Sequence, residues 1–262
     1  MGNGNDALSW PPNFIAHLVD RGYQVIRYDH RGTGLSTSKE KWKKKKAYSL
    51  NDMADDVVAI LDTLDVKKAH VIGVSMGGMI AQIVAIENPE RTASLTSIMS
   101  SAHVMDSELP PMSNKIVPKM ISAILKHGFF GGKKGQIKRQ IIQKRILMGE
   151  ATGEIDTRTM AETSLYNLKE RDGYKLISAR HHYVAILNSK SRYEALSQLP
   201  IPTLVIHGEV DPVMPISHGK KMVRAMAQAD SLWINNMGHD LPDLELEEMT
   251  DRMILNFERG TQ

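Results

Sequence analysis

The sequence contains no cysteine among its 262 residues. A chain without thiols has no disulfide framework, no cysteine nucleophile and no thiolate metal site. It also has little excess charge of either sign, because 33 Lys and Arg residues stand against 30 Asp and Glu residues, leaving a net charge of +3. This balance argues against a protein that binds nucleic acid or an anionic membrane surface through its charge.

Long apolar runs and targeting segments are also missing. No apolar stretch approaches the roughly 20 residues that a bilayer span requires, so we expect no membrane span. The opening stretch MGNGNDALSW lacks a basic segment followed by an apolar core. Together with the absence of cysteine, these features favour a cytoplasmic location. A hydrophobic fraction of 42% and a charged fraction of 24% are typical of a globular protein with a sizeable packed core.

Short apolar, β-rich runs alternate along the chain with amphipathic helical patterns. The runs do not alternate strictly between polar and apolar residues, which indicates strands that are covered on both faces. We expect strands at 23–29, 68–75, 94–100, 203–208 and 231–236, and helices at 10–21, 50–64, 76–88, 217–229 and 244–258. Repeated strand–helix units predict an α/β fold with a mostly parallel sheet and helices on both faces.

One segment, 103–199, contains helical patterns without a convincing strand. We interpret residues 1–102 and 200–262 as the α/β core and 103–199 as a helical cap, or lid, inserted into it. Apolar side chains of this cap either line a substrate pocket or pack the cap onto the sheet. The pocket candidates are Met105, Phe129, Phe130 and Tyr183, with Met112, Met120 and Tyr166 as further members of the same set. We interpret KEKWKKKK (39–46) as a solvated loop and GFFGGKK (128–134) as a flexible link.

The stretch HVIGVSMGGMIAQ places Ser75 between Gly73 and Gly77, with a β-rich run before it and an apolar helix after it. G-x-S-x-G in this context is the nucleophile-elbow pattern, in which the serine occupies a tight strand-to-helix turn that tolerates only small neighbours. The turn presents the hydroxyl above the sheet. The helix start at Met76 directs unpaired N–H groups toward developing negative charge.

A serine hydroxyl needs a base and an acid that orients the base. The elbow pattern predicts the chain order serine, acid, histidine. Asp211 follows the strand at 203–208 and His239 follows the strand at 231–236, so both lie where open α/β sheets place functional groups. Glu209 is the alternative acid and Asp106 a more distant one. His70 and His207 fall within strands, where a packed or hydrogen-bonded role is expected.

Several segments together resemble the α/β-hydrolase superfamily. Residues 1–36 resemble the segment from its oxyanion loop to its DxRGxGxS loop, YSLNDMADDVVAILDTL resembles the helix before its elbow, and PTLVIHGEVDPVMP and NNMGHDLP resemble its acid and base loops. Within the superfamily the chain is most similar to esterases of the aclacinomycin-methylesterase type. The resemblance implies that Ser75 is the nucleophile, Asp211 the acid and His239 the base. It also implies an oxyanion hole formed by the backbone N–H groups of Met76 and Asn3.

The resemblance further implies strands ahead of the oxyanion loop, one of them beside the strand that leads to the nucleophile. The chain begins at Met1 within this loop. We therefore expect those N-terminal strands to be absent from this chain, and their place to be taken either by upstream sequence or by a second copy in a homodimer.

The function expected from these features is hydrolysis of carboxylic esters through an acyl-enzyme. The substrate would be a small molecule, namely a small to medium hydrophobic ester or a methyl ester, and we expect no cofactor and no metal. A cofactor-free perhydrolase or haloperoxidase, or a C–C bond hydrolase, would use the same triad. A ligand sensor with little turnover is the alternative from another class.

Overall fold

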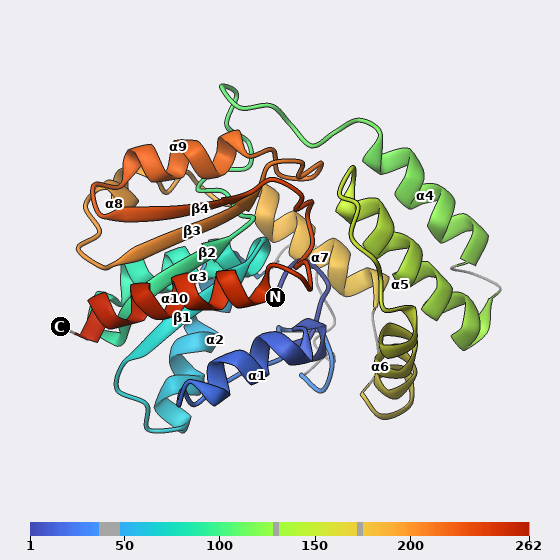
Figure 1. Ribbon diagram of the computed structural model, residues 1–262, viewed down its shortest axis with the longest axis horizontal. Helices are drawn as coiled ribbons and strands as arrows, with labels where there is room; N and C mark the ends of the chain where they lie inside the picture. Colours follow the sequence, from blue (N-terminus) through green and yellow to red (C-terminus); the bar gives the residue numbers. More distant parts are fainter. Residues whose placement is uncertain (37–47, 128–130, 172–174, 262) are drawn as a thin grey trace.

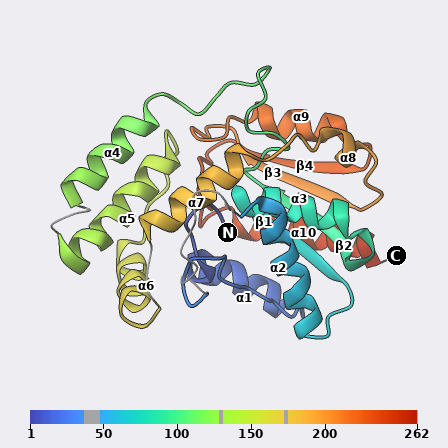
Figure 2. The same ribbon diagram turned by 180° about the vertical axis from the view of Figure 1, so that it is seen from behind.

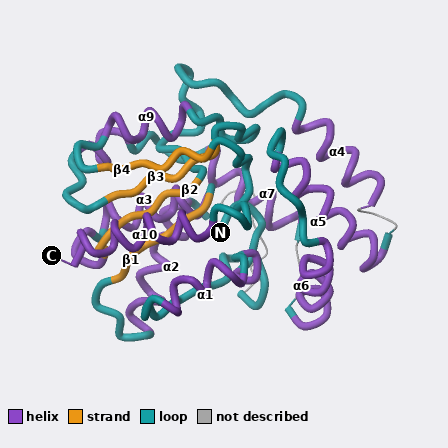
Figure 3. The backbone as a smooth tube through the Cα atoms, in the orientation of Figure 1, coloured by secondary structure: helices purple, strands orange, loops and turns teal. Residues whose placement is uncertain are grey.

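Four parallel strands form the sheet, in the order β1-β2-β3-β4. The computed structural model describes residues 1–36, 48–127, 131–171 and 175–261. Within these residues the strands are β1 (Ala69–Val74), β2 (Thr92–Ile98), β3 (Thr203–Gly208) and β4 (Ala229–Ile234). Figure 3 shows them side by side with loops at their ends. Because all pairs are parallel, the carboxyl ends of the four strands lie at one edge of the sheet.

Helices cover both faces of this sheet (Figures 1 and 2). One face carries α1 (Pro12–Asp20) and α10 (Leu246–Thr261), while the other carries α3 (Met76–Glu87) and α9 (Ser217–Ala225), with α2 (Leu50–Thr63) against α3. Every residue of β2 and of β3 is buried. Strands covered on both faces have no solvent side, which explains why their sequences lack polar alternation.

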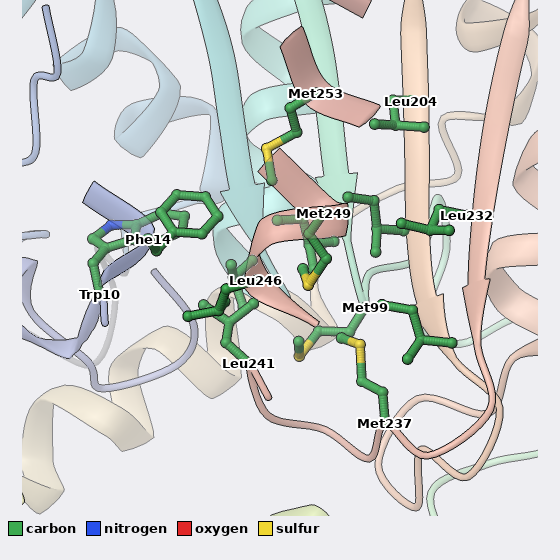
Figure 4. Packing of buried hydrophobic residues seen from close by; sticks show 14 of the residues in the cluster. Trp10, Phe14, Met99, Leu204, Leu232, Met237, Leu241, Leu246, Met249 and Met253 are labelled. Carbon is green, nitrogen blue, oxygen red and sulfur yellow. The ribbon is translucent and has the colours of Figure 1, made fainter. Parts of the chain in front are cut away.

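The core between the sheet and the helices α1 and α10 depends on large side chains spaced along one helix face. Met249, Met253 and Phe257 recur on one side of α10, and Phe14 of α1 belongs to the same cluster against the sheet. Figure 4 shows Phe14, Met249 and Met253 in this cluster. Each of the four is at most 2% exposed. Burying one such side chain stabilises the fold by about 1.5–3 kcal/mol relative to leaving it in water.

The segment 103–199 contains helices only, within the part of it that the structure describes. These are α4 (Ile116–His127), α5 (Gly132–Met148), α6 (Thr157–Glu170), α7 (Leu176–Leu187) and the short α8 (Tyr193–Ser197). In Figures 1 and 2, α4 to α7 lie beyond the carboxyl ends of the strands, whereas α8 lies beside α9. Leu196 of α8 is buried in the core with residues of β3 and α9. The helix α8 therefore packs onto the core, although it falls within the predicted cap range.

Two further sequence interpretations concern the segments 128–134 and 39–46. The predicted flexible link at 128–134 is wrong from Gly132 onward, because α5 already begins there, while 128–130 lie outside the described residues. The predicted solvated loop at 39–46 also lies outside them.

The predicted strand at 23–29 is not a strand. Residues 23–30 pair with no strand of the sheet, although they follow α1 and contain residue types that are common in strands. A cavity of about 330 Å³ separates them from β1, with Val25 and Tyr28 on one side and His70 and Ile72 on the other. A strand exists only through its hydrogen-bonded ladder, and this gap leaves the segment without a partner.

Candidate active site

Ser75 lies on a sharp turn between β1 and α3, with backbone angles of φ 55° and ψ −116°. A positive φ is unusual for a residue with a side chain and indicates local strain. Neighbouring glycines make the turn sterically allowed. A Cβ added to Gly73 would lie 2.0 Å from the carbonyl oxygen of Gly77, and one added to Gly78 would lie 2.6 Å from Cβ of Ser100. The elbow geometry is therefore observed where the sequence predicts it.

A chain of hydrogen bonds links three side chains that are far apart in the sequence. His239 Nε2 lies 2.9 Å from Ser75 Oγ, and His239 Nδ1 lies 2.7 Å from Asp211 Oδ2. The Asp211 side chain is fully buried and the His239 side chain is 8% exposed. Because a carboxylate only accepts, the Nδ1–H donates to Asp211, and Nε2 is left as the acceptor facing the serine hydroxyl. This arrangement is suited to removing the proton from Ser75.

Backbone hydrogen bonds to its other carboxylate oxygen hold the Asp211 side chain in place. Oδ1 accepts the backbone N–H groups of Val213 and Met214, each at 2.8 Å. Burial alone would raise the pKa of Asp211, but the charge and hydrogen bond of His239, the nearby His207 and the backbone N–H of Met214 together lower it below its ordinary value. The carboxylate is therefore ionised at neutral pH, as the orientation of His239 requires.

His207 is one of the two histidines for which the sequence predicts a position inside a strand and a packed or hydrogen-bonded role. It lies in β3, fully buried, and its Nε2 donates to the carbonyl oxygen of Met214 at 2.7 Å. The same nitrogen is 3.6 Å from Asp211 Oδ2. Burial lowers the pKa of His207, so the ring is neutral at pH 7 and packs beside the Asp211 carboxylate.

The two alternative acids lie elsewhere. Glu209 is exposed to solvent. Asp106 forms an ion pair with Lys221, at 2.6 Å. Neither carboxylate hydrogen-bonds to His239 among the described residues.

Two backbone N–H groups close to Ser75 donate no hydrogen bond to another described residue. Met76 opens α3, and the first N–H groups of a helix have no partner within it. The loop at the start of the chain lies against the elbow, since a Cβ added to Gly2 would lie 3.3 Å from Ser75 Cβ. The next residue, Asn3, lines the cavity above the serine, and within the described residues its backbone N–H makes no hydrogen bond. Both N–H groups predicted for an oxyanion hole thus lie near Ser75.

A cavity of about 840 Å³ opens above Ser75 and His239, between the core and the helices α4, α5 and α6. Most of its apolar wall comes from α4 and from methionine and leucine side chains of the core and of the segment 103–199. Its described apolar lining includes Leu8, Trp10, Val74, Met79, Met99, Met112, Ile116, Val117, Met120, Ile121, Ile124, Leu147, Met160, Tyr183, Ile186, Val213, Met214 and Leu241. Its volume falls in the range of roughly 300–1,000 Å³ that is typical of small-molecule sites.

The predicted pocket residues have different outcomes. Tyr183 lines the cavity, as do Met112 and Met120. The prediction for Met105 is wrong: this side chain is 59% exposed and lies outside the cavity. The loop after β2 turns along the surface there, where the neighbouring Asp106 pairs with Lys221. Phe129 and Phe130 lie outside the described residues.

Sequence reasoning missed the contacts through which α5 holds the histidine loop. The backbone N–H of His239 donates to the carbonyl oxygen of Leu147 at 2.8 Å, and Lys144 pairs with Asp240 at 2.5 Å. Burial raises the pKa of Asp240, and Lys144 partly offsets this shift. No local pattern in the sequence indicates these contacts, because almost a hundred residues separate the partners.

The same described residues offer neither a metal-binding cluster nor a membrane-spanning helix. They contain no group of three or more His, Asp or Glu side chains arranged to hold a metal ion. None of their helices combines the length and apolar character needed to cross a bilayer.

The comparisons with known proteins agree with this architecture. Residues 2–140 match the family model described as the alpha/beta hydrolase fold, and residues 185–257 match one described as TAP-like protein. The chain is similar to rhodomycin D methylesterase of Streptomyces peucetius, with 29% identity over 263 residues that cover 92% of this chain and 83% of that one.

Solved structures show the same fold at lower sequence identity. A hydrolase from Oleispira antarctica matches 98% of this chain and 88% of its own, with a TM-score of 0.70 and 21% identity. An esterase from Rhodococcus sp. matches 100% of this chain and 88% of its own, with a TM-score of 0.69 and 18% identity. From the family match and the shared fold, the chain belongs to the α/β-hydrolase family.

Proposed function

We propose that the protein is a serine hydrolase that cleaves carboxylic esters. The observation that carries this proposal is the hydrogen-bonded chain from Asp211 through His239 to Ser75, which ends at the floor of the 840 Å³ cavity. The similarity to a methylesterase over most of the chain supports ester hydrolysis in particular.

The proposed reaction proceeds in two acyl-transfer steps. Ser75 Oγ attacks the ester carbonyl carbon while His239 Nε2 takes the hydroxyl proton, and Asp211 stabilises the imidazolium that forms. The tetrahedral intermediate collapses, the C–O bond to the alcohol breaks, and the imidazolium gives its proton to the departing alkoxide. Water then attacks the acyl-enzyme with the same proton transfers, and this step releases the acid and restores Ser75.

The negative charge of the tetrahedral intermediate falls on the former carbonyl oxygen. We assign its stabilisation to the backbone N–H groups of Met76 and Asn3, of which Met76 also contributes the positive end of the α3 dipole. Removing one such donor typically costs roughly 10²- to 10³-fold in kcat. Catalysis therefore depends on how firmly the loop at residues 1–5 is held against Ser75.

The cavity supports small to medium hydrophobic esters or methyl esters as substrates. Its wall is rich in methionine and aliphatic side chains, which adapt to ligands of different shape. Because α4, α5 and α6 form much of this wall, we assign the segment 103–199 the role of a lid that excludes water from the serine.

Active-site labelling combined with ester hydrolysis tests the proposal. The wild type should react with a fluorophosphonate probe and hydrolyse p-nitrophenyl esters, whereas Ser75→Ala should lose labelling and lower turnover by about 10⁴-fold or more. Substitution of Ser101, a buried serine nearby that hydrogen-bonds to His218, supplies the matched control: Ser101→Ala should still be labelled. Labelling that survives Ser75→Ala would refute the proposal.

The same samples separate the competing functions. Peroxide-dependent halogenation that exceeds ester turnover would favour a perhydrolase, and cleavage of a C–C bond in a diketone-type substrate would favour a C–C hydrolase. Tight ligand binding with almost no turnover across a panel of acyl chain lengths would favour a sensor.

A further inference from the structure

The loop that carries the proposed oxyanion donor forms a tight turn over residues 2–5. The backbone N–H of Asn5 donates to the carbonyl oxygen of Gly2 at 3.2 Å, and Gly4 has a φ of +71°. A positive φ at the third position is typical of a type II turn. Asn3 is the second residue of this turn and its N–H belongs to the peptide that joins it to Gly2, so the position of this donor depends on where the turn is anchored.

In a turn of this kind, the orientation of the central peptide is only weakly determined by the turn itself. Type I and type II turns share the same end-to-end hydrogen bond and differ chiefly in the orientation of the peptide between their second and third residues. Here that peptide joins Asn3 to Gly4, and its N–H belongs to Gly4. The bond from Asn5 to Gly2 alone does not fix its orientation, whereas an acceptor for the Gly4 N–H does.

That acceptor is the side chain of His182. The Gly4 N–H donates to His182 Nδ1 at 3.1 Å, and His182 Nε2 lies 2.9 Å from the carbonyl oxygen of Arg31. A backbone N–H on one side and a carbonyl on the other fix the tautomer, with Nδ1 accepting and Nε2–H donating. The ring is fully buried, and burial lowers the pKa of His182 to about 4, so it is neutral at pH 7.

The ring is itself held firmly by its helix. His182 and Ser178 are four residues apart on α7 and therefore share one face of it. Ser178 Oγ donates to the carbonyl oxygen of Gly32 at 2.6 Å, next to the carbonyl that His182 contacts. Two side chains of α7 thus hold the loop at residues 31 and 32, and one of them continues to the turn above Ser75.

We propose that His182 is a positioning residue for the oxyanion hole: by accepting from the Gly4 N–H it holds the turn over residues 2–5 in its type II form and in its place beside Ser75, and so keeps the Asn3 N–H, which belongs to the preceding peptide, in position for the tetrahedral intermediate. The inference rests on the proposed ester hydrolysis. It assigns to a side chain from the 103–199 segment a role in the chemical step, although His182 is not among the described residues that line the cavity above Ser75. A misplacement of the donor by about 1 Å through loss of this contact is expected to slow the reaction by up to roughly 10²-fold.

Two substitutions separate the two hydrogen bonds of the ring. His182→Phe keeps a planar ring but removes both bonds. His182→Asn places an amide oxygen near the position of Nδ1, so it preserves an acceptor for the Gly4 N–H while losing the donor to Arg31. The measurements are kcat and KM for a p-nitrophenyl ester, together with the melting temperature of each variant.

We expect His182→Phe to lower kcat by about 10- to 100-fold with KM changed less than about threefold, since the donor acts on the transition state rather than on the bound ester. His182→Asn should recover kcat to within about fivefold of the wild type, even where its melting temperature is as low as that of the Phe variant. An unchanged kcat in His182→Phe, or an Asn variant as slow as the Phe variant, would overturn the inference.

A half-buried histidine outside the site provides the control for general loss of packing. His70 hydrogen-bonds to Ser94 and lies five residues before Ser75 on β1, about 16 Å away at the rise of a strand. His70→Phe should leave kcat within about twofold of the wild type. The Ser75→Ala variant distinguishes the two levels of the argument: if it stays active, the proposed function fails, and if it is inactive while His182→Phe is fully active, only the role of His182 fails.

Discussion

Replacing Asp211 by asparagine changes one atom of the proposed triad and reverses the direction of a hydrogen bond. In the protein, Asp211 Oδ2 accepts from His239 Nδ1 at 2.7 Å, while Oδ1 accepts two backbone N–H groups at 2.8 Å. An asparagine keeps its oxygen toward the two backbone donors and presents its NH₂ group to His239. The opposite orientation would set that NH₂ group against both backbone donors and leave them unpaired, at a cost of about 1–3 kcal/mol for each.

The NH₂ group converts Nδ1 of His239 into an acceptor. The neutral ring then carries its proton on Nε2, which lies 2.9 Å from Ser75 Oγ and no longer accepts the hydroxyl proton. Such a wrong tautomer costs on the order of 10⁴-fold in kcat in serine proteases, which corresponds to about 5.4 kcal/mol of barrier height. We therefore expect Asp211→Asn to lower kcat by roughly 10³- to 10⁴-fold while KM changes little.

Steady-state hydrolysis of a p-nitrophenyl ester measures this loss. Glu209→Gln is the matched control, because it makes the same acid-to-amide change on an exposed side chain two residues earlier in the loop. This control should retain full turnover. A kcat for Asp211→Asn within tenfold of the wild type, or an equal loss in Glu209→Gln, would refute the reasoning about the tautomer and the choice of acid.

Three further predictions concern stability. Gly73→Ala should lower the free energy of unfolding by about 3 kcal/mol or more, because its Cβ would lie 2.0 Å from the backbone oxygen of Gly77; a urea midpoint equal to the wild type would contradict this. Phe14→Ala should cost about 3–5 kcal/mol in the same assay, since the ring is 1% exposed, and a loss below about 1 kcal/mol would argue against the packing described for α1. The lowered pKa of Asp211 means that the unfolded chain binds a proton first as the pH falls. Its contribution to stability is therefore present above the unfolded value of about 3.9 and is lost at lower pH, so the melting temperature should fall on acidification less steeply in Asp211→Asn than in the wild type.

The strands β2 and β3 could be predicted because their sequences follow directly from burial on both faces, and β1 and β4 because they are short β-rich runs between helical patterns. The same reasoning located Ser75, Asp211 and His239, since each follows a strand and parallel strands end at one edge of the sheet. Their mutual distances could not be predicted, because they depend on the turns after the strands. The turn at Ser75 itself is the exception. Gly73 and Gly77 are four residues apart and in close steric contact, so their spacing in the sequence indicates the turn.

Failures occurred where a side chain's surroundings come from distant parts of the chain. Residues 23–29 have the composition of a strand, but a ladder needs a partner at pairing distance, and a cavity occupies that place. Met105 has the apolar character of a pocket residue, but its direction is set by a surface loop that an ion pair to Lys221 holds. Composition predicts neither the partner nor the direction.

The same physical reason explains why the role in catalysis that we propose for the segment 103–199 is not revealed by its sequence. The core supplies Ser75 and Asp211 through short connections from strands, so their placement is largely local. The other two parts of the proposed chemistry depend on distant contacts: His239 is held through its backbone to Leu147 of α5, and the turn at Asn3 is held through His182 of α7. Since both contacts come from helices that also enclose the cavity, a substitution that reshapes the cavity for another ester also shifts the base or the oxyanion donor. Binding and rate are therefore expected to change together when these helices are altered, whereas changes confined to α10, which does not line the cavity, should affect stability alone.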